Sequence, residues 1–502
     1  MKKFCNVRFF VLLFMAFVFG HIFAVYSSIS RTILYVEFFI ACAIMITGSV
    51  MIFANYKKYI RFLLKSVICI LACIICMCMT LIRIELQSRD NKIPTANYVI
   101  SGEVVSINYE NNIAYIDNVM LNAGEYKVYG KCKLNLFLEA TELEVGDNII
   151  FVGEYNPNFI PKLYETYSAK LQLNSDSLLA RAESSSFSYK IRKSIKQKLN
   201  SVASEDVAQI QYAMLFGDKS GLNEVTKDQF SMVGLSHLLA VSGLHIGFVI
   251  AVISKLLDWL IKNKRWVSFA IKSLLILGYL VLCNFAISAT RAVIMSMVLL
   301  YADARGKRYD ALSALSFAGC LIMMINPYQF FDVGFQLSFM VVFGLIGIAP
   351  LFSRLFEKVM PNWLNKSLSI SISSQIASFP IIAYNFSNIP VLAMILNMIV
   401  IPYVSIAFML LCISCIISVI IPPFSAILKL PSVLFRLLIY VVDSISRLDI
   451  ISIKFGLETL ATIFAVLSIL VASQFNLMNK RNKAMFTLVL LAISTVFVIF
   501  NI

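Results

Sequence analysis

Two of the three histidines in this 502-residue chain lie in one apolar stretch, GLSHLLAVSGLHIGFVI, at residues 234–250. The side chains of His237, Ser242 and His245 offer hydrogen-bonding, general-base or metal-ligating chemistry. On a continuous helix the two imidazoles would lie about 80° apart. No third ligand is evident, so no metal site is predicted. Two interpretations stay open: histidines bonded to neighbouring helices, and histidines that line a path or contact a substrate. As an alternative to a continuous helix, a break at Ser242–Gly243 would divide the stretch into two half-helices.

Further polar side chains interrupt the apolar sequence after residue 213. They are Asp218 and Lys219 in MLFGDKSGL, Arg291 in FAISATRAVIM, Asp332 and Gln336 in NPYQFFDVGFQLSF, and Asn397 in MILNMIVIP. Polar groups are costly in lipid and usually face a bundle interior or a pathway. Arg291 is interpreted either as an arginine that reaches the interface or as a phosphate contact. Together these residues indicate an intramembrane core that is lined by polar groups and has few carboxylates. Such a core suits the passage of a polyanion better than the passage of protons or metal cations.

The composition determines where such residues must lie. The chain is 59% hydrophobic and 14% charged, against about 25% charged in soluble domains. Apolar runs near the bilayer-spanning length of about 20 residues recur. The sequence therefore predicts a polytopic α-helical membrane protein with an inserted extracytoplasmic small β-barrel (OB-like) domain. The predicted spans are about 7–26, 33–53, 62–84, 233–261, 267–287, 290–302, 310–326, 335–353, 366–387, 391–421, 430–446, 457–475 and 484–502.

The formal net charge is +15, and 19 of the 43 basic residues lie in six short clusters that flank the apolar spans. We interpret these clusters as positive-inside topology signals rather than as a nucleic-acid surface. They predict a multi-pass protein of the cytoplasmic membrane, with a cytoplasmic N-terminus and residues of about 88–230 outside. The run 7–26 is interpreted as a retained span rather than a signal peptide.

The extracytoplasmic segment changes to short alternating stretches typical of strands. Five such strands in about 80 residues favour a small OB-like barrel. Between Asn97 and Glu183 twelve acidic residues stand against six basic ones, a net of −6. A groove that follows phosphates should be basic. A structural or docking domain is therefore favoured over a single-strand binding domain.

The next segment, YKIRKSIKQKLN, is basic. We interpret it as an amphipathic helix at a membrane surface, with nucleic-acid contact as the alternative. Its basic residues are Lys190, Arg192, Lys193, Lys196 and Lys198. The predicted domains are residues 1–87 (N-terminal spans), 88–185 (OB-like), 186–230 (connector) and 231–502 (channel).

At SHLLAVSGLHIG the sequence resembles the ComEC family of competence proteins, which are inner-membrane channels for DNA uptake. The stretches MLFGDKSGL, SATRAVIM, NPYQFFDVGFQLSF and YNFSNIPVLAMILNMIVIP follow in the family's order and at similar spacing. The resemblance implies transport of single-stranded DNA across the cytoplasmic membrane during natural transformation. By motif match the resemblance also implies a set of functional residues, to which it assigns no individual roles. They are Asp218, Lys219, His237, Ser242, His245, Arg291, Asp332, Gln336 and Asn397.

One departure from the family concerns nuclease activity. Many members continue into a domain resembling metallo-β-lactamases, whereas this chain has three histidines and no HxHxDH-type cluster. Any nuclease is therefore expected on another chain, and no cofactor is predicted. LFGDKSGL lacks the GxxxxGK[ST] spacing, so a separate ATPase or helicase is expected, together with a DNA receptor and contacts with membrane lipid.

Two alternatives to a channel remain. The first is a membrane-embedded hydrolase built from His237, His245, Ser242 and Asp218. The second is a transporter of another anionic polymer or envelope precursor.

Overall fold

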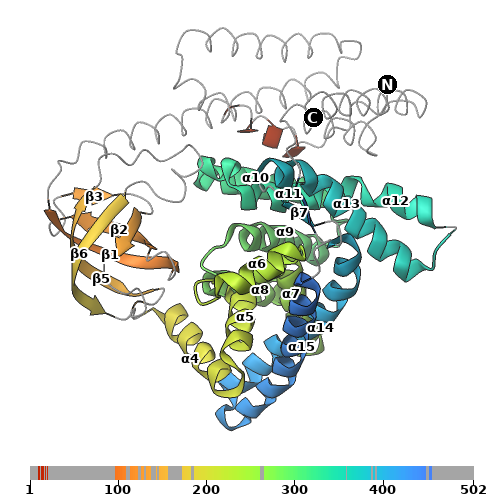
Figure 1. Ribbon diagram of the computed structural model, residues 1–502. Helices are drawn as coiled ribbons and strands as arrows, with labels where there is room; N and C mark the ends of the chain where they lie inside the picture. Colours follow the sequence, from red (N-terminus) through yellow and green to blue (C-terminus); the bar gives the residue numbers. More distant parts are fainter. Residues whose placement is uncertain are drawn as a thin grey trace, which may run out of the picture. The chain divides into compact units, whose positions relative to one another are not determined.

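The computed structural model divides the chain into two compact units (Figure 1). The first comprises Met1–Ser184 with Asp310–Asp332, and the second comprises Ser185–Tyr309 with Val333–Ile502. The structure describes most of residues 97–182, residues 186–447 with gaps at 261–264, 358, 386–387 and 391–392, residues 452–454, and scattered positions from 10 to 20. The predicted spans at 33–53, 62–84, 457–475 and 484–502 lie outside the described residues, as does most of 7–26.

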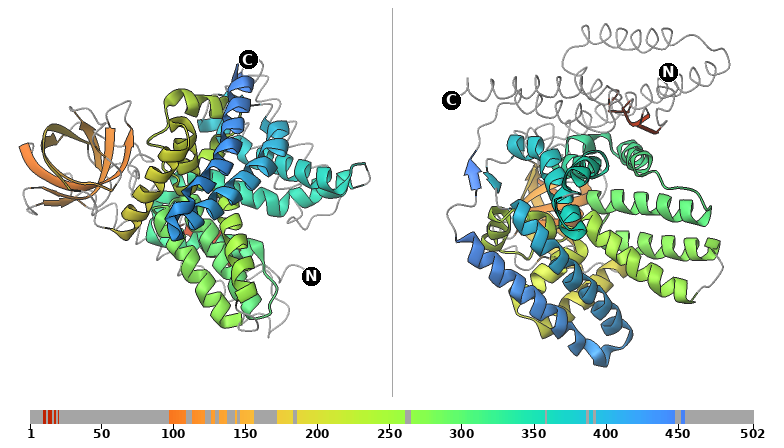
Figure 2. Two further views of the ribbon diagram at one scale, coloured as in Figure 1. Left: turned by 90° about the horizontal axis from the view of Figure 1, so that it is seen from below. Right: turned by 90° about the vertical axis from the view of Figure 1, so that its right-hand side faces the viewer.

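The first unit contains a six-stranded, mainly antiparallel sheet. Its strands are β1 (Asn97–Asn108), β2 (Ile113–Leu121), β3 (Tyr126–Val128), β4 (Cys132–Leu136), β5 (Asn148–Tyr155) and β6 (Gln172–Ala182). β1 pairs with both β2 and β5, β5 with β6, β2 with β3 and β4, and β4 with β6 in parallel. The sheet is strongly curved (Figure 2). The alternating stretch YKVYGKCKLNLFL, predicted to be one strand, contains two strands, β3 and β4.

Alternation along the strands determines which face is buried. Ile100 on β1 pairs with Leu121 on β2 and with Phe151 on β5, and all three side chains are buried. Val99, one residue earlier, points to the other face and is 44% exposed. The buried Asp147 carboxylate, just before β5, accepts a 2.8 Å hydrogen bond from Arg181 Nε at the end of β6. This ion pair joins the start of β5 to the end of β6.

The same unit contains the apolar helix α10 (Ala311–Ile325) and the 3₁₀ turn η5 (Pro327–Phe331). Phe317 on α10 makes an edge-to-face contact with Phe10, with ring centroids 5.3 Å apart. α10 matches the predicted span 310–326, but its 15 residues are fewer than the roughly 20 that cross a bilayer untilted.

The described part of the second unit is almost entirely helical. Its elements are α4 (Phe187–Val202), α5 (Glu205–Phe216), α6 (Glu224–Met232), η4 (Ser236–Leu239), α7 (Gly243–Leu260), α8 (Arg265–Leu282), α9 (Ile287–Ala304), α11 (Val333–Gly347), α12 (Ala349–Phe356), α13 (Asn362–Asn385), β7 (Asn388–Pro390), α14 (Ala393–Ile420), η6 (Pro422–Leu428), α15 (Lys429–Ser446) and β8 (Ser452–Lys454). β7 and β8 pair antiparallel.

Local side chains determine where several of these helices begin and end. The Ser186 hydroxyl accepts a hydrogen bond from Tyr189 N at 3.2 Å and begins α4. Asn223 caps α6 in the same way through Thr226 N at 2.7 Å. Gly217 ends α5 with φ of 80°, a left-handed conformation that favours glycine.

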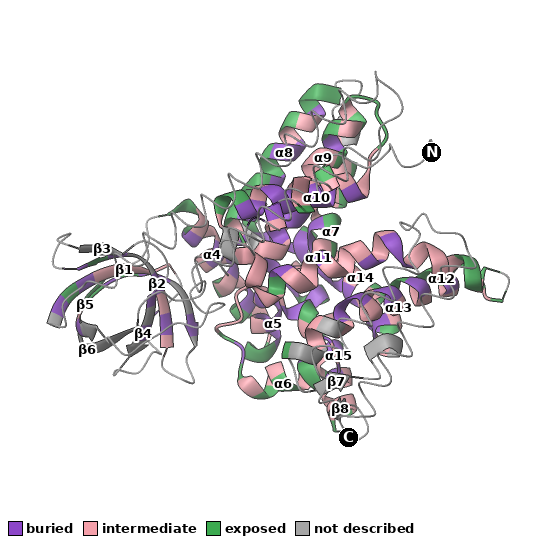
Figure 3. Ribbon diagram, turned by 90° about the horizontal axis from the view of Figure 1, so that it is seen from above, coloured by how far each residue is buried: buried purple, intermediate pink, exposed green. Residues whose placement is uncertain are grey.

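The core of the second unit forms where α5 packs against α14 and α15. Phe408 on α14, Phe435 on α15 and Ile210 on α5 are all buried in one cluster. Figure 3 shows buried residues concentrated where these helices meet. α4 and α6 contribute Leu199 and Phe230 to the same cluster.

The outward faces of the long helices are apolar. Leu274 on α8 is 71% exposed and Ile420 at the end of α14 is 72% exposed. Four helices of the described part are long and apolar enough to cross a membrane: Arg265–Leu282, Ile287–Ala304, Leu396–Ile420 and Phe424–Ser446. Such continuous apolar surface is typical of lipid contact. The second unit is therefore a helical membrane domain.

Two predicted spans differ from the observed helices for local reasons. The span 335–353 consists of α11 and α12, which bend by 41° at Ile348. The span 391–421 is one helix, α14, in spite of Pro402 in its interior. Apolar sequence predicts that a segment is buried in lipid, but not that its helix is straight.

Candidate functional site at the break before α7

The chain breaks between η4 and α7, within the stretch that carries two histidines. Ala240 is extended, with φ of −110° and ψ of 149°, and α7 begins at Gly243. A continuous helix over 233–261 is therefore wrong, and a break at Ser242–Gly243 is confirmed. The reason is local, because Ser242 makes a capping interaction with His245 that starts a new helix.

This capping interaction is reciprocal. His245 N donates to the Ser242 hydroxyl at 3.4 Å, and Ser242 N donates to His245 Nδ1 at 3.2 Å. The pattern is a capping box in which a histidine occupies the position usually held by Glu or Gln. Because Nδ1 accepts a hydrogen bond, the proton of the neutral ring lies on Nε2.

The His245 ring is fully buried and stacks on Phe408 of α14, with ring centroids 4.4 Å apart and planes at 29°. Its Nε2 has no hydrogen-bond partner among the described residues. His237, in contrast, is exposed on η4. The two histidines therefore occupy different environments despite their similar sequence surroundings.

Arg291 reaches this break from the second turn of α9. Its side chain is buried, with 5% exposed. Nη1 donates to the carbonyl of Ser338 on α11, and the guanidinium lies over the Phe339 ring, 5.9 Å from the centroid. A Cβ placed on Gly243 would lie 2.9 Å from Nη2. The guanidinium thus fills the space that a side chain at the first residue of α7 would occupy.

The charge of Arg291 is not balanced by a carboxylate in the described part of the chain. Arg291 forms no ion pair there, and its buried Nε has no partner. The first turn of α9 also holds the break, because the Ser288 hydroxyl donates to the Val241 carbonyl. The N-termini of α7 and α9 therefore lie beside a buried cation, and both helix ends carry partial positive charge.

The loop after α5 lies against the same break. A Cβ on Gly217 would lie 3.3 Å from the Val241 side chain. Asp218 folds back within the loop, accepting from Ser220 N at 3.1 Å and from the Ser220 hydroxyl at 2.6 Å. Lys219 is half-buried, and this burial together with Lys227 lowers its pKa below the usual lysine value.

Other predicted residues lie elsewhere. Asn397 is buried on α14, eleven residues before Phe408 and so about 16 Å from it along the axis. Its Oδ1 has no partner among the residues described. Gln336 lies half-buried on α11 in the second unit, whereas Asp332 belongs to the first unit.

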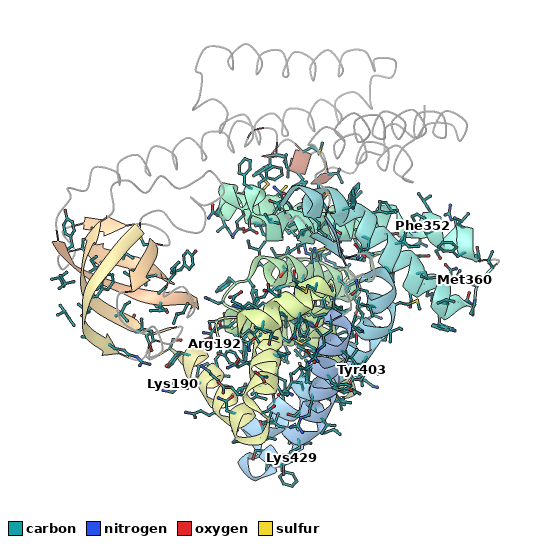
Figure 4. All side chains as sticks on the ribbon, in the orientation of Figure 1. Lys190, Arg192, Phe352, Met360, Tyr403 and Lys429 are labelled. Carbon is teal, nitrogen blue, oxygen red and sulfur yellow. The ribbon has the colours of Figure 1, made fainter. Side chains whose placement is uncertain are left out.

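The basic residues of α4 do not all face outward (Figure 4). Arg192 is buried, and Lys198 Nζ donates to the Ser418 carbonyl in the last turn of α14. A cation is favourable at a helix C-terminus, which explains why Lys198 turns inward. Lys193 and Lys196 lie over the rings of Tyr189 and Tyr212, at 5.7 and 6.0 Å from the centroids. Lys190 is exposed.

Sequence reasoning missed several residues that shape the site: Gly243 as the space for Arg291, Ser288, Ser338, Phe339 and Phe408. Ser288 lies three residues before Arg291, on the same helix face, and that spacing was a usable signal. Phe408 and Phe339 lie in apolar runs with no distinguishing pattern.

Comparison with known proteins identifies the family of the chain. Residues 214–480, more than half of the chain, match the family described as Competence protein. The chain belongs to this family. The resemblance to the ComEC competence proteins is confirmed. The match begins inside α5 and spans the break, α9 and α14.

Individual competence relatives are similar over shorter stretches. ComE operon protein 3 of Bacillus subtilis (strain 168) is 31% identical over 225 residues, covering 44% of this chain and 28% of the relative. Competence protein ComA of Neisseria gonorrhoeae is 27% identical over 205 residues, covering 38% and 28%. The chain thus spans under a third of either relative's length. No solved structure matches it.

Proposed function

We propose that the chain is a membrane channel that translocates single-stranded DNA across the cytoplasmic membrane during natural transformation. Membership of the competence family and the long apolar helices support this function. The similarity to ComE operon protein 3 and to competence protein ComA supports the same assignment.

The single observation that carries the proposal is the charge of Arg291, which no carboxylate balances among the described residues. Burying a guanidinium without a counter-ion costs several kcal/mol, and two helix N-termini beside it increase that cost. A phosphate of the DNA backbone would supply the missing negative charge. It would also accept hydrogen bonds from the guanidinium and from free backbone N–H groups.

The geometry at Ser242 supports a channel over a hydrolase. A serine nucleophile needs its hydroxyl to donate to a base. Here the hydroxyl accepts from His245 N, and Nδ1 of the same imidazole is occupied by Ser242 N. Nδ1 is therefore occupied by the cap and is not available as a base for this hydroxyl.

The sheet of the first unit is proposed to organise the entrance to the channel. Its pairings connect five strands in the cycle β1–β2–β4–β6–β5, which supports an OB-like barrel. The segment 97–183 has a net charge of −6. An acidic surface repels phosphates, so we assign it to docking with a DNA receptor rather than to binding the strand.

The remaining assignments concern topology and partners. Residues of about 88–230 are proposed to be extracytoplasmic, with the N-terminus in the cytoplasm. A separate ATPase or helicase would drive translocation, a nuclease on another chain would degrade the second strand, and the exposed Lys190 would contact lipid.

Replacing Arg291 tests this function. In a competent host that depends on this gene, Arg291→Gln should lower entry of labelled DNA into the cytoplasm at least tenfold, because the amide keeps hydrogen bonds but no charge. Arg291→Lys, which keeps the charge, should retain part of the uptake. DNA bound outside the cell and protein in the membrane fraction should both remain at wild-type levels. Normal uptake by Arg291→Gln would refute the proposal.

A further inference from the structure

We infer that His245 is a positioning residue. It fixes the first turn of α7 beside the Arg291 guanidinium and does not itself line the path. This inference rests on the proposed function for its significance. Its geometry rests on the reciprocal hydrogen bonds with Ser242 and on the contact between Arg291 and Gly243.

The His245 ring is fixed on two sides. Its Nδ1 is bound to Ser242 N, and its face stacks on Phe408. The side chain is 0% exposed, so a passing strand would not reach it without displacing the cap. Fixing His245 also fixes Gly243, because the capping box determines where the first turn of α7 begins.

The chemical type of the capping residue matters for the charge of the site. A capping box usually carries Glu or Gln at this position. A glutamate at residue 245 would place a carboxylate two residues from Gly243, where Arg291 Nη2 lies. In a low-dielectric interior that carboxylate would neutralise the guanidinium. A neutral imidazole supplies the same acceptor and leaves the positive charge available to a phosphate.

The inference predicts different outcomes for three replacements in the full-length protein in nanodiscs. His245→Leu removes the acceptor and should raise hydrogen exchange of amides 243–246 at least tenfold. It should also weaken binding of fluorescent oligo(dT). His245→Gln restores a neutral acceptor and should keep both properties within about threefold of wild type. His245→Glu should keep the exchange protection but weaken oligo(dT) binding at least tenfold.

Two further variants complete the experiment. Val225→Ala changes a side chain on α6 that is 65% exposed and should alter neither property. Ser242→Ala removes the other half of the cap and should raise exchange as His245→Leu does, which keeps the test decisive if His245→Leu fails to fold.

Two results would overturn the inference: unchanged exchange in both His245→Leu and Ser242→Ala, or a His245→Gln variant as impaired as His245→Leu. If wild-type protein fails to bind oligo(dT), the proposed function fails, whereas the exchange measurements still decide the positioning role.

Discussion

Replacing Gly243 with alanine tests the contact on which the site depends. The new Cβ would lie 2.9 Å from Arg291 Nη2, and ordinary contacts of this kind begin near 3.4 Å. The guanidinium would have to retreat by about half an ångström, away from the helix end. That retreat disturbs its hydrogen bond to the Ser338 carbonyl and its contact with Phe339.

The magnitude follows from two opposing effects. Alanine is favoured over glycine in a helix by about 1 kcal/mol at most. Overpacking a filled site costs about 1–3 kcal/mol. Gly243→Ala should therefore lower the free energy of unfolding by about 0 to 3 kcal/mol. Gly247 lies on the same helix with no atom within 4 Å of its added Cβ, so Gly247→Ala should stabilise by up to about 1 kcal/mol.

The assay is equilibrium unfolding in mixed micelles, in which the two alanine variants should differ by about 1–3 kcal/mol. In an Arg291→Ala background the clash is gone, so the difference should fall below about 0.5 kcal/mol. DNA uptake should fall with Gly243→Ala and remain normal with Gly247→Ala. Equal stability and equal uptake of the two variants would refute the proximity of Gly243 and Arg291.

Two further predictions concern other parts of the second unit. A Cβ on Gly344 would lie 2.5 Å from the Ala377 Cβ and 2.8 Å from the Ser373 carbonyl oxygen. Gly344→Ala should therefore push α11 away from α13. The amount of folded protein in the membrane fraction should fall severalfold. The pKa of Lys219 is lowered by burial and then by Lys227. Its unprotonated amine therefore forms at lower pH than an ordinary lysine's, and the midpoint of its acylation by an N-hydroxysuccinimide ester should shift to higher pH in Lys227→Met.

Much of the sheet could be predicted because alternation and turns are local signals. The predicted stretches YVISGEVVSINY, NIAYIDNVM and GDNIIFVGEY match β1, β2 and β5 within about two residues. The split into β3 and β4 was missed because one continuous alternating stretch covers both. The predicted stretch YSAKLQLN starts at Tyr167, and its first five residues lie outside the described part of the chain, whereas β6 covers Gln172–Ala182.

The site itself was only partly predictable. Ser242 and His245 carry a capping signature in their spacing, so a break at this point was foreseeable. The contact between Arg291 and Gly243 joins residues 48 positions apart, and the Ser338 carbonyl lies 47 positions further on. Such distant contacts depend on how α7, α9 and α11 pack, which hydrophobic periodicity does not determine. For the same reason the inward turn of Lys198 on α4 was not foreseen.

The charge of Arg291 constrains its neighbours more than any sequence pattern does. A guanidinium that is 5% exposed needs space, which Gly243 provides by lacking a Cβ. Its observed acceptor, the Ser338 carbonyl, carries no full charge. A carboxylate in either place would hold the guanidinium more strongly, but the closed ion pair would leave no reason for a phosphate to bind. Among the described residues Arg291 has only uncharged partners, and this supports the proposed anion path over a structural salt bridge.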